Sequence, residues 1–368
     1  MRILVVGAGI AGLALVRALT KHGIDAVAFD KRPGTTTEGL GINLPGNAIR
    51  ALDEVGVGVP LRQLGPPVDR REYRTPRGRL LFTVDEREFW GEPLVPRCVL
   101  RPDLAAALAD GLPVDSIRWN ASVSAVRATH AGAEVELADG TIERGDLVVG
   151  ADGVRSTVRE SVFPGAARTV SPVSATSLRF VGRDPGGIDA WTLWSDAKGA
   201  MLLIPMSGGR LYGYASATQG DTIGTDRTWI EATFAKYPEP VRTVVATLGD
   251  VYHSPVEEVR IPRWHAGRAV LIGDAAHAIA PFWAQGGALA VEDALVLADV
   301  LAGGLDASKA GAAFEERRRA RVEHVRAATD RLARTAAMPT WLRDLALPFA
   351  GPKAYREAYG PLRGSVLA

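Results

Sequence analysis

The chain has 368 residues, of which 47% are hydrophobic and 23% charged, as in globular proteins with a sizeable core. At about 150 residues per domain, this length suggests two domains or one domain with an insertion. The formal net charge of +1 is too small for a nucleic-acid-binding protein, so we expect no nucleic-acid partner. Cys98 is the only cysteine, which excludes an intrachain disulfide and multi-cysteine metal sites and suits a cytoplasmic location.

The N-terminal sequence RILVVGAGIAGLALVRALTKHGIDAVAFDKR predicts a strand over 3–6, a glycine turn, a helix and a second strand over 24–29. Gly7, Gly9 and Gly12 form a G-x-G-x-x-G fingerprint in the strand–turn–helix context that confirms it. Gly7 allows the tight turn, Gly9 lets the backbone approach a pyrophosphate, and Gly12 lets the helix pack closely. The free N–H groups at the helix start favour phosphate.

Asp30 ends the second strand at the distance where an acid takes the ribose hydroxyls of a nucleotide. An acid there prefers a free ribose diol to a 2′-phosphate. The motif therefore predicts the adenosine half of NAD or FAD and does not separate the two.

The pattern then changes to short strands over 71–97, and a helix begins after Cys98. A strand–turn pattern follows, with Asp139-Gly140 as a hairpin signal, before a long stretch that predicts an antiparallel sheet with two amphipathic helices. The α/β pattern resumes at about residue 262, so we expect a sheet domain inserted into a Rossmann-type one. No apolar run reaches the roughly 20 residues of a membrane span, and we expect no membrane partner.

An arginine-dense segment, FEERRRARVEHVRAATDRLARTA, follows near the C-terminus. It is a polyanion site or a long helix with a charged, solvated face, and the nearby glutamates favour the helix. We find no metal-ligand spacing among the six histidines.

Two further glycine turns carry an acid: GADG, with Asp152, and GDAAHA, with Asp274. Asp152 is able to accept from neighbouring backbone N–H groups and from an arginine, and so to stiffen a loop beside a pyrophosphate. Asp274 is a ligand contact, a helix N-cap, or both. His277 has no partner acid nearby in sequence except Asp274, so we expect a packed, hydrogen-bonded histidine rather than a catalytic base.

The ordered triple GAGIAG, GADG and GDAAHA resembles the FAD-dependent aromatic hydroxylases, or class A flavoprotein monooxygenases, which share the fold of para-hydroxybenzoate hydroxylase. The resemblance covers roughly residues 1–330. It implies an α/β fold in which a Rossmann-type FAD-binding domain carries an inserted, mainly antiparallel β-sheet substrate domain and a C-terminal helical segment. The expected FAD-binding domain is 1–70, 98–171 and 262–330, the substrate domain is 71–97 and 172–261, and the helical tail is 331–368.

The resemblance extends to PFWAQGGALAVEDA, where Pro281 would border the flavin and the N–H groups of residues 285–287 would face its N1–C2 edge. Ala284 and Ala288 depart from the family's usual Gly and Asn or Gly. GLGINLPGNAIRAL (39–52) also fits, but Thr35, Thr36 and Thr37 stand where a basic residue is common. The cofactor contacts implied in this way are Gly7, Gly9, Ile10, Ala11, Gly12, Asp30, Lys31, Arg32, Arg101, Val123, Asp152, Gly153, Arg155, Gly273, Asp274, Pro281, Gln285, Gly286, Gly287 and Ala288.

The family's reaction is the insertion of one O₂ oxygen into an electron-rich small molecule through a C4a-hydroperoxyflavin, with NAD(P)H as a transient electron donor. The cofactor does the chemistry, so no catalytic side chain is assigned. Epoxidation or Baeyer–Villiger oxidation on the same scaffold, a non-catalytic flavin-binding redox sensor and a simple NAD dehydrogenase remain alternatives.

We expect a monomer or homodimer that acts on an aromatic or polycyclic, largely apolar substrate with few charges. The expected pocket residues are Arg179, Trp194, Leu203, Tyr212, Tyr214, Phe282 and Trp283.

Overall fold

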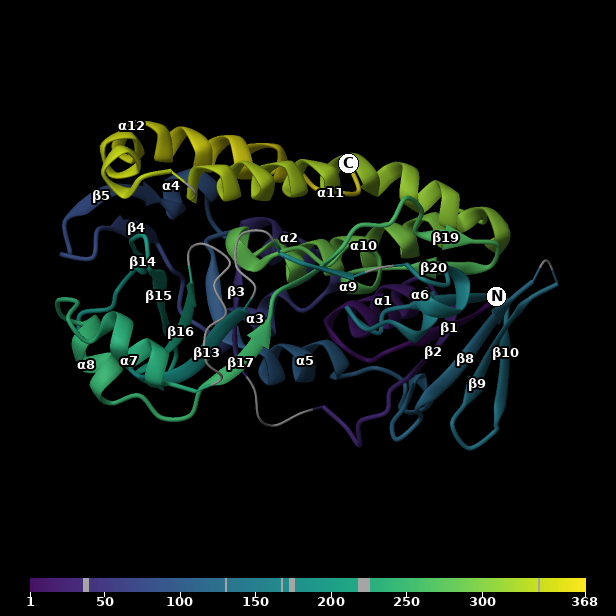
Figure 1. Ribbon diagram of the computed structural model, residues 1–368. Helices are drawn as coiled ribbons and strands as arrows, with labels where there is room; N and C mark the ends of the chain where they lie inside the picture. The colour runs from purple at the N-terminus through teal and green to yellow at the C-terminus, as the bar shows by residue number, and fades with distance from the viewer. Residues whose placement is uncertain (36–39, 130, 167, 172–175, 218–225, 337) are drawn as a thin grey trace.

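The computed structural model describes residues 1–368 except 36–39, 130, 167, 172–175, 218–225 and 337. Two large sheets form its body, and the long helices α11 (Ala307–Ala336) and α12 (Thr340–Tyr359) run side by side along one edge (Figure 1). The predicted fold class, an α/β domain with a mainly antiparallel second sheet and a C-terminal helical segment, is confirmed. Within the described residues, no helix is both long and apolar enough to cross a membrane.

The first sheet has six strands in the order β19-β20-β11-β1-β2-β7, and all neighbours run parallel except the edge pair β19–β20. Its strands are β1 (Arg2–Val6), β2 (Asp25–Phe29), β7 (Ile117–Arg118), β11 (Leu147–Gly150), β19 (His265–Ala266) and β20 (Ala269–Leu271). Val6, Gly150 and Leu271 are register partners across β1, β11 and β20. The three turns that follow these strands therefore meet at one edge of the sheet.

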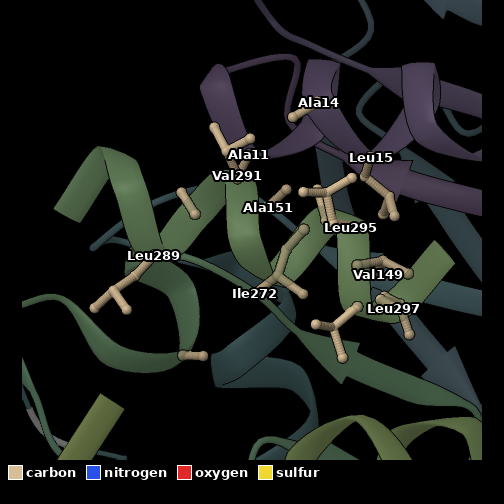
Figure 2. Packing of buried hydrophobic residues seen from close by; sticks show 14 of the residues in the cluster. Ala11, Ala14, Leu15, Val149, Ala151, Ile272, Leu289, Val291, Leu295 and Leu297 are labelled. Carbon is tan, nitrogen blue, oxygen red and sulfur yellow. The ribbon is translucent and has the colours of Figure 1, made fainter. Parts of the chain in front are cut away.

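Small side chains let two helices pack closely over this sheet. Figure 2 shows Ala11, Ala14 and Leu15 of α1 (Ile10–Lys21) beside Val291 and Leu295 of α10 (Gln285–Ala302). The other helices and 3₁₀ turns of this half are α2 (Gly46–Val55), α3 (Gly58–Leu64), α5 (Arg101–Ala109), η1 (Val114–Ser116), α6 (Thr157–Val162), α9 (Asp274–His277) and η2 (Pro281–Trp283). The start of α10 is thereby held close to the start of α1.

The second sheet has seven strands in the order β17-β13-β16-β15-β14-β4-β5, and only β14 and β4 pair in parallel. It joins β4 (Arg70–Arg74) and β5 (Leu80–Asp85) to strands from much later in the chain: β13 (Thr176–Arg183), β14 (Trp191–Ser195), β15 (Gly199–Met206), β16 (Arg210–Ala217) and β17 (Tyr252–Pro255). The two predicted amphipathic helices are present, as α7 (Thr228–Phe234) and α8 (Val241–Ala246), and they cover one face. The other face is left for the site.

Smaller sheets complete the fold. The pairs are β3 (Gly41–Leu44) with β6 (Arg97–Leu100) and β12 (Arg168–Val170) with β18 (Glu257–Val259); a third sheet orders β8 (Val123–Ala128), β9 (Ala133–Leu137) and β10 (Ile142–Gly145) as β10-β9-β8. The predicted hairpin turn at Asp139-Gly140 joins β9 and β10, and Gly140 has a φ of +86°.

The arginine-dense segment forms most of α11, but its predicted solvated face is partly wrong. Arg318 is fully buried and Arg326 nearly so, and both lie in ion pairs. Arg318 is buried because its partners, Glu292 and Asp293, lie on α10 beneath it. The helix also runs without a break past residue 330, the expected end of the FAD-binding domain.

A buried ion pair fixes the C-terminal helix. Arg71 of β4 donates from Nε to Oε1 of Glu86 at 2.7 Å, and Glu86 belongs to the short helix α4 (Glu86–Trp90). The hydroxyl of Tyr355 on α12 and Nε1 of Trp90 both donate to Oε2 of Glu86. The Arg71 guanidinium lies 4.2 Å from the centroid of the Trp191 ring. The chain ends with the 3₁₀ turn η3 (Gly360–Leu362).

Glu86→Ala should lower the free energy of unfolding by about 3–5 kcal/mol, because it leaves the 2%-exposed Arg71 side chain charged and unpaired. Urea unfolding of the purified proteins measures this. Glu231→Ala, which removes the exposed ion pair with Arg227 on α7, is the control and should change stability far less. An equal loss of unfolding free energy in both variants would show that the buried ion pair stabilises the fold no more than an exposed one.

Candidate active site

The three glycine turns predicted from the sequence lie against one another. Gly7 has a φ of +100°, and a β-carbon there would lie 2.6 Å from the Ala151 carbonyl oxygen, so the first two turns touch. A β-carbon on Gly12 would lie 1.9 Å from the Gly7 oxygen, whereas one on Gly9 would meet nothing within 4 Å. Gly7 and Gly12 are thus needed for packing, and the space beside Gly9 leaves room for a ligand.

The acid at the end of β2 is held by the turn itself. Asp30 Oδ2 accepts from the Ala8 N–H at 2.8 Å, and the Arg32 guanidinium donates to both carboxylate oxygens. Burial alone would raise the pKa of Asp30, but the donors from Arg32 and Ala8 outweigh it and hold the pKa below its usual value. Asp30 is therefore a carboxylate that already has partners before a ribose arrives.

Asp152 braces the start of α6. Its Oδ2 accepts from the Thr157 and Val158 N–H groups at 2.7 and 3.1 Å, which confirms the expected backbone contacts. The expected arginine contact is wrong, because the buried Arg159 donates instead to the carbonyl oxygens of Val154 and Ala275. Burial raises the pKa of Asp152 above its ordinary value.

Asp274 presents its carboxylate to the cavity described below. It is the first residue of α9, and Gly273, with a φ of +56°, occupies the N-cap position. Of the two roles considered for Asp274, the N-cap is therefore excluded, and its exposed side chain is available to a ligand. The space that a β-carbon on Gly273 would fill is bounded by Ala11 and Ala290, at 3.2 and 3.3 Å.

His277 is packed and hydrogen-bonded, as predicted, but to an unforeseen partner. Its Nε2 lies 2.7 Å from Oδ2 of Asp293, which also accepts from the Gly273 N–H at 2.8 Å. Arg318 donates from Nε to Oδ1 of the same carboxylate at 2.7 Å. Burial would raise the pKa of Asp293, but His277 and Arg318 hold it below its ordinary value.

The start of α10 faces the same cavity. Gly286 and Gly287 line it, whereas Ala288 is fully buried and Gln285 exchanges two side-chain hydrogen bonds with Asn47. Ala284 keeps the left-handed conformation, with a φ of +52°, that suits the family's usual glycine. This departure costs about 1–2 kcal/mol of strain, and the first N–H groups of α10 still have no carbonyl partner within the helix.

One cavity of about 730 Å³ joins these turns to the uncovered face of the seven-stranded sheet. Among the expected cofactor residues, its walls include Gly9, Ile10, Ala11, Arg101, Gly153, Asp274, Pro281, Gly286 and Gly287. Several other expected residues lie near the turns but outside the walls that the described residues form: Asp30, Lys31, Arg32, Val123 and Asp152. The Arg155 side chain is exposed, and its Nε lies 3.8 Å from Oε2 of Glu257. Thr36, Thr37 and Gly39 lie outside the described residues.

Five of the seven expected pocket residues line the cavity: Arg179, Tyr212, Tyr214, Phe282 and Trp283. Trp194 and Leu203 do not, because they pack in the core under α7 and α8 on the opposite face of the sheet. Side chains alternate between faces along a strand, so the neighbours Leu193 and Leu202 line the cavity in their place.

Two further walls of the cavity lie outside the expected pocket residues. Tyr73, Phe82 and Trp191 come from β4, β5 and β14, and α12 contributes residues from Leu347 to Ala358. The strand pairing could have identified the sheet residues, because residues directly opposite Arg179 on neighbouring strands lie on the same face of the sheet. No pattern in the α12 sequence indicates that it reaches the site.

The polar groups of the pocket gather on β13 and β16. The Tyr214 hydroxyl is buried near Ser177 and Ser216, but no described residue meets the distance and angle criteria for a hydrogen bond with it. Arg179 lies with its guanidinium 5.8 Å from the Tyr214 ring centroid. Burial raises the pKa of Tyr212 to about 12 and also raises that of Tyr214, so both remain hydroxyl donors at neutral pH.

These residues fit a long dinucleotide such as FAD. The open space beside Gly9 and the N-terminus of α1 suit a pyrophosphate. Arg101 and Asp274 line the part of the cavity between this space and α10, where the rest of a dinucleotide would lie. The start of α10 then offers N–H groups and the positive end of a helix dipole to the ring system. The cavity continues from the three turns to the start of α10, so it extends beyond what one nucleotide half would require.

Comparison with known proteins agrees with this geometry. The family described as "FAD binding domain" matches residues 1–331. The chain is 32% identical over 335 residues to 2-heptyl-3-hydroxy-4(1H)-quinolone synthase of Pseudomonas aeruginosa, covering 89% of this chain and 87% of the relative. It is also 32% identical to aurachin C monooxygenase/isomerase of Stigmatella aurantiaca over 310 residues, which is 82% of this chain and 80% of that protein.

A similar solved structure is Klebsiella pneumoniae HpxO complexed with FAD and uric acid, with a TM-score of 0.85 and 25% identity, covering 100% of this chain and 97% of that one. The cofactor of the family is FAD, and its members named here are oxidoreductases. The chain belongs to the family of class A FAD-dependent aromatic hydroxylases.

Proposed function

We propose that this protein is an FAD-dependent, NAD(P)H-consuming monooxygenase that adds one oxygen atom of O₂ to an aromatic or other electron-rich small molecule. The observation that carries the proposal is the single cavity that joins the three cofactor turns to an aromatic-lined sheet face. Bound FAD would supply the redox chemistry between NAD(P)H and O₂. A cytoplasmic location and a monomeric or homodimeric state remain predictions.

The side chains of this protein bind, orient and exclude water. Asp274 and Arg101 would hold the cofactor, and the N–H groups at the start of α10 would stabilise negative charge on its ring. Tyr214 and Arg179 would orient an oxygen atom of the substrate, since both present donors on the cavity wall. Trp283, at the edge of the cavity near α12, would keep water from the reacting atoms.

The substrate that this pocket fits is flat, largely apolar and sparsely charged. Arg179 is the one arginine that the sheet strands place on the described walls, and aromatic and aliphatic side chains surround it. Stacking and burial would then supply most of the binding energy. The relatives named for a quinolone and an aurachin, and the HpxO complex with uric acid, are consistent with a flat ring.

The purified protein should release FAD on acid precipitation and should oxidise NAD(P)H faster when a suitable aromatic compound is added. A panel of quinolones, purines and phenols tests this, with NAD(P)H absorbance and product mass as readouts. A gain of one oxygen atom in the product supports the proposal, and the position of that oxygen separates hydroxylation from epoxidation or Baeyer–Villiger oxidation. FAD bound without any stimulated turnover would favour a flavin-binding sensor. A small dianionic aromatic acid as best substrate would contradict the apolar pocket.

Asp274→Ala should weaken FAD binding by about 1–3 kcal/mol, because an engaged carboxylate acceptor is lost from the cavity wall. Equilibrium titration of the apoprotein with FAD measures the effect. Asp250→Ala removes an exposed carboxylate on the loop after α8 and is the matched control. An FAD affinity equal to that of the control would show that Asp274 does not hold the cofactor.

Trp283→Ala should raise KM by about tenfold and increase hydrogen peroxide release, because the substrate loses a stacking partner and water gains access. The bond from the Tyr359 hydroxyl to the Trp283 carbonyl oxygen, 2.7 Å long, uses the backbone and survives the change. Trp194→Phe, on the opposite face of the sheet, is the control and should leave KM and coupling unaltered. Wild-type KM and coupling in Trp283→Ala would place Trp283 outside the pocket.

A further inference from the structure

The sheet face of the cavity has two chemically different ends. One residue from each of six neighbouring strands forms a single cross-strand row on this face: Arg179, Tyr214, Leu202, Leu193, Tyr73 and Phe82. At about 4.8 Å between strands, five spacings make this floor roughly 24 Å long. The floor is much longer than a fused bicyclic ring needs, and its one charged side chain, Arg179, lies at the β13 end.

Most polar groups at the β5 end are already engaged, with the buried Trp191 Nε1 an exception among the described residues. The Tyr355 hydroxyl donates to Glu86, and Tyr73 lies close to the Arg71 guanidinium. Tyr73 stacks on Phe82 with ring centroids 4.2 Å apart, which leaves hydrocarbon as the surface. The only charged side chains on the α11 and α12 walls among the described residues, Arg331 and Glu357, are exposed.

Beyond Phe82 the cavity is walled by small or aliphatic side chains of α12: Leu347, Ala350, Gly351 and Ala354. Gly351 lies so close to β5 that a β-carbon there would stand 2.3 Å from the Phe82 ring. Gly351 therefore lets α12 pack directly on the Phe82 ring, and the small and aliphatic side chains around this contact leave the end of the cavity apolar, which favours an apolar occupant.

We propose that this end of the cavity binds an aliphatic chain, so that the substrate is an amphiphile with a flat, oxygen-bearing ring and a hydrocarbon tail. The ring lies toward Tyr214 and Arg179, and the tail lies along the apolar walls that Phe82, Leu347 and Ala354 form. This inference rests on the proposed monooxygenase function, because it names the substrate class of the same cavity. It does not require turnover, because chain binding is measured separately.

The test is equilibrium binding of 2-methyl- and 2-heptyl-4-quinolone to the FAD-loaded protein, followed by changes in the flavin absorbance spectrum. Each buried methylene contributes about a fourfold gain in affinity. Burial of only two of the six additional methylenes therefore makes the heptyl compound more than about tenfold tighter. Equal dissociation constants, or no binding of the heptyl compound, would overturn the proposal.

Two variants test where the aliphatic tail of the ligand binds. Ala354→Phe narrows the apolar end of the cavity, which Ala354 lines, so it should remove the preference for the heptyl compound while leaving the affinity for the methyl compound within about twofold. Ala346→Phe lies on the same helix, exposed and away from the described cavity walls, and should change neither affinity. Ala350→Phe is a second filling variant, to be used if Ala354→Phe fails to retain FAD.

The outcomes separate this proposal from the general function. A chain-length preference that Ala354→Phe abolishes supports the tail site even if no tested compound is turned over. A preference that survives both filling variants, or a loss of affinity for both quinolones alike, overturns the tail site while stimulated NAD(P)H oxidation still supports the monooxygenase.

Discussion

The carboxylate of Asp293 is the interaction on which the cofactor half depends. It is fully buried, and a buried charge is tolerated only when partners replace its water. Here the partners are the Gly273 N–H, the His277 ring and the Arg318 guanidinium, so one group ties the GDAAHA turn to α10 and α11. The left-handed turn at Gly273 is thereby fixed in the position that presents Asp274 to the cavity.

The neighbouring carboxylate of Glu292 holds the start of α10 in a similar way. It accepts from Arg318, Arg321 and Asn47, and Asn47 in turn exchanges hydrogen bonds with Gln285 in the first turn of the helix. A helix start anchored from below cannot shift when charge develops near its N–H groups. The N–H groups at the start of α10 are therefore held in place before the reaction, and no free energy is spent on reorienting them when negative charge develops.

The sequence was informative wherever a backbone requirement left a glycine and an acid in strand–turn–helix order, because the geometry of those turns admits few alternatives. It was weaker where the outcome depended on long-range packing. Trp194 and Leu203 look as suitable for a pocket as Leu193 and Leu202, and only the covering by α7 and α8 decides which face is core. The burial of Arg318 depended on acids some 25 residues earlier, and the approach of α12 to the cavity depended on a glycine fitting against Phe82.

The two halves of the cavity are held by different forces, and this difference has a consequence for specificity. Removing one partner of a buried ion pair costs about 3–5 kcal/mol, whereas an apolar side chain of similar volume is exchanged for less than about 1.5 kcal/mol. The network of Asp293 and Glu292 therefore leaves little freedom around the cofactor, while the apolar residues that line the sheet face should tolerate substitution better than the buried Arg71–Glu86 pair behind them. Members of the family carry names for substrates as different as a quinolone and urate. Such variety is expected when the tolerant half of the site is the half that meets the substrate.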